Sequence, residues 1–322
     1  MPLLPLDIPA GIYRNGTDLQ SQGRWRDSNL VRWHDGTMQP IQGWRIRSAT
    51  ATANIPRSLK IWIDNSNNRW IAAGTFQNLY VYNDDSAQYN ITPSNLTAGS
   101  ETAVDSTSFG GGSYGNDPYG EPRPESTLGV PATTWSLDQW GQYLLACSNA
   151  DGKIYEWQLS TSTIAAVLSN APTGNTAIMV TDERFVFALG AGGNPRKIQW
   201  SDRENNNLWA AAATNEAGSI ELQTSGVIQC GVRVQNQALI LTTTDAHTAT
   251  YSGPPYVYGV ERVGTSCGCV SAQGVAVVDM GAVWMGRESF FVYSGGTVQE
   301  LASDVSDYIY SDINVAQMSK IV

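Results

Sequence analysis

The chain is predicted to be an all-β protein of the β-propeller class, because one pattern of strands and turns returns five times along its 322 residues. Each copy has an apolar strand, a short turn and a second apolar strand, and then an aromatic residue followed at once by polar turn residues. The composition agrees with this class, since 31 Gly, 14 Pro, 11 Trp and 14 Tyr favour strands and turns over helices.

The five copies have similar lengths. They cover residues 59–85, 133–158, 177–202, 231–253 and 274–296, and their closing aromatics are Tyr82, Trp157, Trp200, Tyr251 and Tyr293. These aromatics are spaced by 75, 43, 51 and 42 residues, and three of the four gaps are close to the length of a propeller blade. The long first gap contains residues 99–131, which are too rich in Gly, Pro and Ser to pack a core and are therefore predicted to be an insertion.

Alternating apolar residues show why one copy cannot fold alone. Phe185, Phe187 and Leu189 share one face of a strand, as do Leu239 and Leu241. Such a face needs a neighbouring sheet to cover it, so the copies over residues 59–301 are expected to stack around an axis.

Residues 1–58 are predicted to be an arm of a different kind. Three tryptophans, among them Trp44, lie there beside five arginines, which are Arg24, Arg26, Arg32, Arg45 and Arg47. The Asp35-Gly36 turn predicts a hairpin. This arm is expected either to supply closing strands for the ring or to form a protein interface, where large aromatics and guanidinium groups anchor contacts.

Residues 302–322 are predicted to hold the one helix. Apolar residues recur there at intervals of three and four, from Leu301 to Ala316, and Ser303 or Asp304 is placed to cap the helix. Ile321 and Val322 favour β-structure, so a further strand is expected to begin there. The native chain is accordingly expected to continue past Val322, with five copies not completing the ring.

Charge separates the arm from the body. Residues 1–60 hold eight basic and four acidic residues, a net of +4, whereas the remainder holds 11 basic and 25 acidic residues, a net of −14. An acidic body repels a nucleic-acid backbone instead of binding it, although the same balance also serves plain solubility.

The sequence shows no apolar stretch long enough for a membrane span, and its start lacks the basic region of a secretory signal. Synthesis and retention in the cytosol of a cell are expected. Four cysteines in a chain of this length are predicted to be reduced, buried thiols.

Candidate chemical groups are sparse. His34 and His247 lie far apart and are predicted to be surface histidines, while Cys267 and Cys269 lack the further ligands of a zinc site and are predicted to be buried thiols on one strand face. The glycines at 110–112 and 190–193 lack the residues of a phosphate-binding loop. We therefore predict no catalytic, cofactor or metal site, and no enzyme.

Several segments resemble those of a known family. They are WSDRENNNLW at 200–209, TNEAGSIEL at 214–222, Tyr251-Ser-Gly, GTSCGC at 264–269, VWMG at 283–286 with FFVYSGG at 290–296, the acidic segment DVSDYIYSDIN at 304–314, and NLVRWHDGTMQPIQGW at 29–44. Together they are similar to the propeller of podovirus tail nozzle proteins, also called packaged DNA stabilisation proteins. Members of that family are generally longer than this chain.

The resemblance implies a structural virion protein of a short-tailed phage. Family members form rings of six copies below a connector or adaptor ring and lead to the tail tip, with fibre or spike proteins nearby. The genome passes along the ring's channel without specific binding, and neither membrane insertion nor a cofactor is implied. On this basis Arg24, Trp25, Arg26 and Trp33 are predicted to lie at a subunit or adaptor interface, although Trp25 and Trp33 fit equally well as core of a closing blade.

Two other functions remain open from the residues. SNADGKIYEW and SGGTVQEL resemble the Asp-box turns of sialidase propellers, so a carbohydrate-binding or glycan-cleaving propeller is the alternative, with tryptophans stacking on sugars. A cellular scaffold propeller ranks last because no peptide-binding signature is present.

Overall fold

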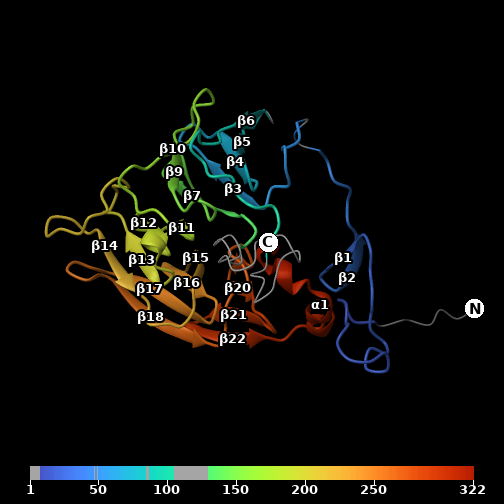
Figure 1. The fold of residues 1–322 in the computed structure, drawn as a ribbon. Coiled ribbons are helices and arrows are strands. Elements are labelled where there is room, and N and C mark those ends of the chain that lie inside the picture. The colour runs from blue at the N-terminus through green and yellow to red at the C-terminus, as the bar shows by residue number, and fades with distance from the viewer. Residues whose placement is uncertain (1–7, 47, 49, 85–86, 105–129) are drawn as a thin grey trace, which may run out of the picture.

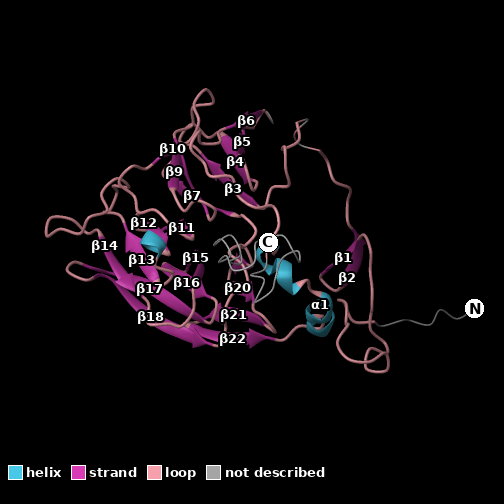
Figure 2. Ribbon diagram, viewed as in Figure 1, coloured by secondary structure: helices cyan, strands magenta, loops and turns pink. Residues whose placement is uncertain are grey.

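Five sheets, each of four antiparallel strands, account for the five repeats and make the chain an all-β propeller (Figure 1). The computed structural model describes residues 8–46, 48, 50–84, 87–104 and 130–322. A separate two-stranded sheet precedes the blades, and the helical segments are short (Figure 2).

Each blade is built from four strands consecutive in the sequence. Blade 1 consists of β3 (Ser58–Ile63), β4 (Arg69–Gly74), β5 (Leu79–Tyr82) and β6 (Gln88–Asn90), and blade 2 of β7 (Trp135–Trp140), β8 (Tyr143–Ser148), β9 (Ile154–Trp157) and β10 (Ala166–Val167). Blade 3 consists of β11 (Ala177–Val180), β12 (Val186–Leu189), β13 (Lys197–Trp200) and β14 (Gly218–Glu221), and blade 4 of β15 (Ile228–Val234), β16 (Gln237–Thr242), β17 (Asp245–Gly253) and β18 (Val257–Thr265). Blade 5 consists of β19 (Val275–Val278), β20 (Gly281–Met285), β21 (Phe290–Ser294) and β22 (Thr297–Leu301).

The first strand of every blade lies at the axis. Along the ring β3 packs beside β7, β7 beside β11, β11 beside β15, and β15 beside β19. Four apolar cores fill the four spaces between successive blades. A wedge between blades 5 and 1 contains no sheet within the described ranges (Figure 1).

Aromatic rings fill the core between blades 1 and 2. Trp62, Trp70 and Trp157 contact one another with ring centroids 5.2 to 6.5 Å apart. Trp135 of β7 is buried, and its indole N–H donates to the Thr75 carbonyl at 2.6 Å. A Cβ on Gly74 would lie only 2.4 Å from the Trp135 ring, so this close approach requires glycine.

Asp64 organises the turn between β3 and β4. Its carboxylate accepts from the Ser66 and Asn68 backbone N–H groups, at 2.8 and 2.9 Å, and from the Trp70 indole at 3.0 Å. The hydrogen bonds from Trp70 and Asn68 lower the pKa of Asp64 to about 2. The turn thus gives the buried Trp70 indole N–H a charged acceptor.

The N-terminal strands do not close the ring. β1 (Val31–His34) and β2 (Thr37–Pro40) form the predicted hairpin, but they pair only with each other, and their side chains are exposed or half-buried. The expectation of a closing strand is therefore wrong. The arm instead bonds to the C-terminal segment, because the Arg14 and Asn15 N–H groups donate to the Asp304 carbonyl.

The C-terminal helix is confirmed, and its predicted cap is wrong. Helix α1 covers Ser306–Asp312, its N-cap is Val305, and no side chain caps it. A 3₁₀ segment, Val315–Lys320, follows α1, and the Ile321 carbonyl then accepts from the Ser271 hydroxyl at 2.6 Å. The strand expected to begin at Ile321 and to continue beyond Val322 stays a prediction.

The insertion begins and ends at one place on the propeller. Val104 and Val130 form an isolated antiparallel bridge with backbone hydrogen bonds of 2.9 and 2.8 Å. The chain between these two residues, with the glycines at 110–112, lies outside the described residues. The paired ends show that the segment leaves blade 1 and returns to blade 2 without displacing a blade.

Replacing Trp135 by Ala is expected to lower the free energy of unfolding by about 3–5 kcal/mol, because the change leaves a cavity between two blades and orphans the Thr75 carbonyl. Denaturant titration measures this loss. Trp44→Ala is the matched control, since Trp44 is 98% exposed and its loss should cost less than about 0.5 kcal/mol. Equal losses in the two variants would contradict the packing described.

Asp64→Asn is expected to destabilise the protein in a pH-dependent way. The pKa of Asp64 is about 2 in the folded chain and roughly 3.9 when unfolded, so its charge stabilises the fold above about pH 4 and ceases to do so as the pH falls through 2. Thermal unfolding of both proteins between about pH 2 and 7 should show a gap in Tm that narrows toward the acid end. A constant gap would contradict the assignment.

Candidate functional site

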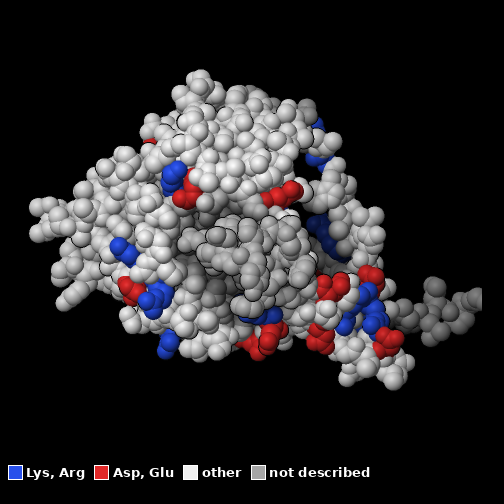
Figure 3. All heavy atoms as spheres, in the orientation of Figure 1, with Lys and Arg blue, Asp and Glu red and all other residues white. Residues whose placement is uncertain are grey.

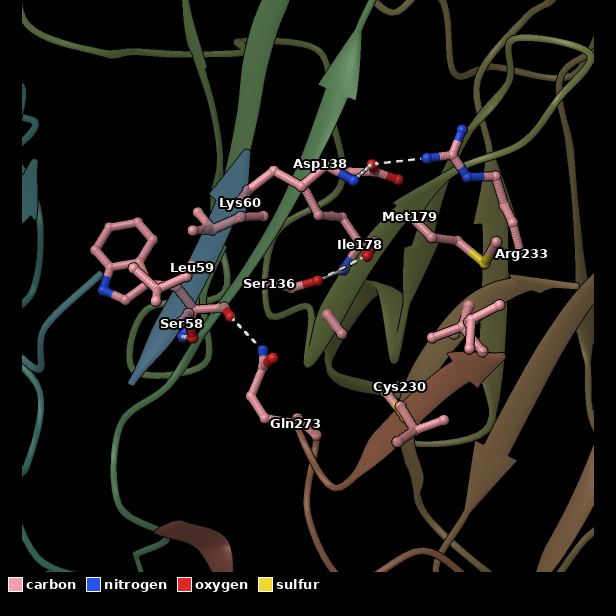
Figure 4. Close-up of a pocket in the computed structure, with 18 residues that line it drawn as sticks. Ser58, Leu59, Lys60, Ser136, Asp138, Ile178, Met179, Cys230, Arg233 and Gln273 are labelled. Atoms are coloured by element: carbon pink, nitrogen blue, oxygen red, sulfur yellow. Dashed lines mark hydrogen bonds and ion pairs between the residues drawn. The ribbon is translucent and has the colours of Figure 1, made fainter. Parts of the chain in front are cut away.

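A cavity of ≈ 360 Å³ lies on the propeller axis, between the first strands of all five blades (Figure 4). Its lining combines backbone edges with side chains that point inward from each strand. Figure 4 shows that they come from different blades, and the polar ones include Ser58, Lys60, Ser136, Asp138, Arg233 and Gln273. This is where side chains distant in sequence meet.

Asp138 is the centre of the charged part of this cavity. It is buried, and its carboxylate lies 2.7 Å from the Lys60 ammonium and 3.3 Å from the Arg233 guanidinium. Its other oxygen accepts the Val180 backbone N–H at 2.7 Å. Four blades therefore meet at one carboxylate, and both cations that reach it are neutralised by it and by Asp182, 3.9 Å from Arg233.

Gln273 ties blade 5 to blade 2 across the axis. Its side-chain N–H donates to the Trp135 carbonyl at 2.7 Å from the loop before β19. The C-terminal segment covers one mouth of the axis, because the Ser319 hydroxyl accepts the Ala132 N–H at 3.0 Å and Ser319 lines a hollow of ≈ 430 Å³ there. The axis is thus narrow and partly covered.

The prediction for His247 is wrong, because this histidine is buried. Its Nε2 lies 3.2 Å from the Asp245 carboxylate, and both residues are on β17. Burial raises the pKa of Asp245, but hydrogen bonds donated by Thr242 and Thr224, together with His247, outweigh burial and lower it. His34 is exposed in the β1–β2 hairpin, as predicted.

The cysteines are free and buried, as predicted. Cys267 and Cys269 lie in the core between blades 4 and 5, but in the loop after β18 and not on a strand. Their N–H groups donate to the Thr244 and Thr242 carbonyls. In the part of the chain that the structure describes, no three His, Cys, Asp or Glu side chains gather as a metal site would need.

The four predicted interface residues all lie in the arm, where two of them form ion pairs within the chain. Arg24 lies 2.9 Å from Asp304, and Arg26 pairs with Asp18. Trp25 forms an isolated bridge with Ile12, and Trp33, on β1, is half-buried. The structure neither places these residues in a blade nor shows a partner, so the interface remains a prediction.

Charges are mixed where the arm meets α1. Figure 3 shows acidic and basic atoms side by side at this junction, while most of the visible face is uncharged. The contacts there include Arg14 with Asp27 at 3.3 Å and the Arg14 guanidinium 4.2 Å from the Tyr308 ring centroid. On this face the excess acid of the sequence does not form one continuous surface.

The tryptophans do not form a sugar-binding platform on the blades. Eight of the eleven are buried, which are Trp62, Trp70, Trp135, Trp140, Trp157, Trp200, Trp209 and Trp284. Their role is packing, and the exposed one, Trp44, lies in the arm. The carbohydrate alternative thus loses the tryptophan platform that it invoked on the blades.

Comparison with known proteins gives fold likeness alone. No protein-family model matches the chain, and a search of curated protein sequences finds no relative. Solved structures with a similar fold include a virginiamycin B lyase from Staphylococcus aureus, with a TM-score of 0.45 and 11% identity over 76% of this chain and 71% of that one. YCF48 from Cyanidioschyzon merolae has a TM-score of 0.44 and 10% identity, over 77% and 71%.

The first of these proteins is an enzyme by name, and at this identity the name does not extend to the present chain. Within the described residues, no helix is long and apolar enough to cross a membrane.

Asp138→Asn is expected to lower the free energy of unfolding by about 2 kcal/mol, because Lys60 and Arg233 would lose their shared counter-charge at the axis. Denaturant titration tests this. Asp182→Asn is the matched control, since Asp182 is about half-exposed and 3.9 Å from Arg233, and it should change the stability by less than about 0.5 kcal/mol. A neutral Asp138→Asn would show that the cluster does not hold the blades together.

Proposed function

We propose that this chain is a structural subunit of a short-tailed phage virion, a tail nozzle or hub that assembles into a ring, retains packaged DNA and passes it during ejection. One observation carries the choice of an assembly protein over other classes: in the described part of the chain, the apolar side chains of β3 are exposed beside the wedge between blades 5 and 1, and α1 covers only part of the blade 5 side. The assignment to a phage tail comes from the resemblance of residues 29–44, 200–222 and 264–314.

The small axial cavity supports a role in which each propeller forms part of the wall of a channel and does not itself contain the channel. Its ≈ 360 Å³ is crossed by the Lys60, Asp138 and Arg233 contacts, so a polymer cannot pass along the axis of one propeller. In the proposed assembly the conduit is enclosed between subunits, and its partners are further copies, an adaptor or connector above, and tip and fibre or spike proteins below.

The acidic balance supports the handling of DNA without binding it. With a formal net charge of −10, the chain repels a phosphate backbone at short range. Packed DNA would accordingly slide past this subunit. Neighbouring tail proteins would retain the DNA, and this chain would make no base contacts with it.

The purified chain is expected to form a closed ring of several copies, with a pore wide enough for duplex DNA, in electron micrographs. It should not retard duplex DNA in a gel at about 0.1 M salt, because like charges repel. A chain that stays monomeric and binds glycans on an array would overturn the proposal in favour of the carbohydrate alternative.

A further inference from the structure

One face of blade 1 is covered by blade 2, and the other is bare along β3 but buried at Ala73 of β4 and Tyr80 of β5. Ser58 and Trp62 of β3 point toward blade 2 and are buried, whereas the alternate residues Leu59, Ile61 and Ile63 are 66%, 62% and 51% exposed. These three apolar side chains form a stripe beside the open wedge. A sheet in a propeller ordinarily has such a stripe covered by the next blade.

Blade 5 bounds the wedge from the other side in the same manner. Ala282, Trp284 and Tyr293 pack against blade 4, so the alternate residues of β20 and β21 face away from it. Tyr310 of α1 covers part of that face, with its ring centroid 5.5 Å from that of Phe290. Beyond it, Val278 is 40% exposed.

The arm carries apolar side chains that also lack a partner. Ile41, Trp44 and Ile46 are 44%, 98% and 85% exposed, directly after the β1–β2 hairpin. Residues 31–46 thus form a hairpin that pairs with no blade strand among the described residues, followed by an exposed apolar tail. The same chain therefore carries an uncovered apolar segment and an uncovered apolar wedge.

The charges of the two are complementary. Residues 31–46 hold two arginines and one aspartate, a net of +1, within an arm whose residues 24–57 have a net of +4, whereas residues 279–322, which form the blade 5 wall and α1, hold six acidic and two basic residues, a net of −4. Arg24 and Asp304, 2.9 Å apart, show that an arginine of the arm pairs with this acidic segment. Opposite charge favours the arm as occupant over another acidic surface.

We propose that the wedge between blades 5 and 1 is a socket for residues 31–46 from a second copy of this chain. The subunit's own arm is held outside the wedge. Asn15 and Arg24 bind Ser303 and Asp304 on one side, and residues 41–46 and 50–57 run outside the wedge toward β3 (Figure 1). Segment and socket on different surfaces of one subunit make a head-to-tail contact, which closes into a ring if the rotation permits. That these contacts close into a ring is an assumption taken from the proposed function.

Crosslinking tests which copy fills the socket. A Trp44→Cys protein and an Ile61→Cys protein are mixed and treated with a short bismaleimide, and the four native cysteines are buried. We expect a covalent dimer of twice the 34.8 kDa chain mass in the mixture and little in either protein alone. Ile61→Cys mixed with Tyr256→Cys is the control, because Tyr256 is 82% exposed in the β17–β18 turn, and it should stay uncrosslinked.

A single chain carrying both Trp44→Cys and Ile61→Cys should also crosslink between chains. A compact crosslinked monomer would instead mean that the own arm fills the wedge, which overturns the proposal. A ring that forms without any crosslink between positions 44 and 61 also overturns it while leaving the proposed function standing. If the copies crosslink but form no ring with a pore, the contact between arm and wedge would be supported and the proposed nozzle function would be rejected.

Ile61→Asp adds a test that does not depend on crosslinking. It should weaken self-association by about tenfold or more, measured by sedimentation, and leave the Tm of the dissociated monomer at low concentration unchanged because Ile61 is exposed within the single chain. Ile164→Asp, at a 48% exposed position between β9 and β10, should leave association intact. Unchanged association of Ile61→Asp would reject the socket.

Discussion

The structure depends on one constraint: a four-stranded blade with two apolar faces is stable only where a neighbour covers them. Blades 2, 3 and 4 have neighbours on both sides, and their strands β8, β11 and β12 are almost entirely buried. Blades 1 and 5 have one neighbour each, so Trp62 and Trp284 are buried while Ile61 is left exposed. The remaining features either complete the covered interfaces or follow from the uncovered ones.

Polar groups complete the covered interfaces by bonding across them. The indole N–H of Trp62 donates to the Gln142 carbonyl, and that of Trp135 donates to the Thr75 carbonyl, so each large ring is packed and satisfied at once. At the axis, where side chains are fewer, Asp138 joins Lys60 to Arg233. Shape and polar pairing together fix the blades around a small cavity, which is why we place any passage for DNA outside the single propeller.

The uncovered interfaces are associated with a separation of charge along the chain. The arm is basic and the last blade with its helix is acidic, and Arg24 and Asp304 bring the two together at the edge of the wedge. In the proposed assembly, apolar stripes would supply the driving force for association, since burial is non-directional, while charges of opposite sign would select the partner and its orientation.

The sequence by itself determined the propeller class, the five blades, the inserted segment and the buried thiols, because each rests on local periodicity or composition. The local sequence pattern was too weak to predict β10 and β14, because these short strands carry little apolar alternation. Only the tertiary structure decided that Lys60, Asp138 and Arg233 meet, that His247 is buried, and which face of β3 is bare. Those facts depend on contacts between residues 78 or more apart in the chain, or on the absence of a neighbouring sheet, and neither leaves a periodic signal.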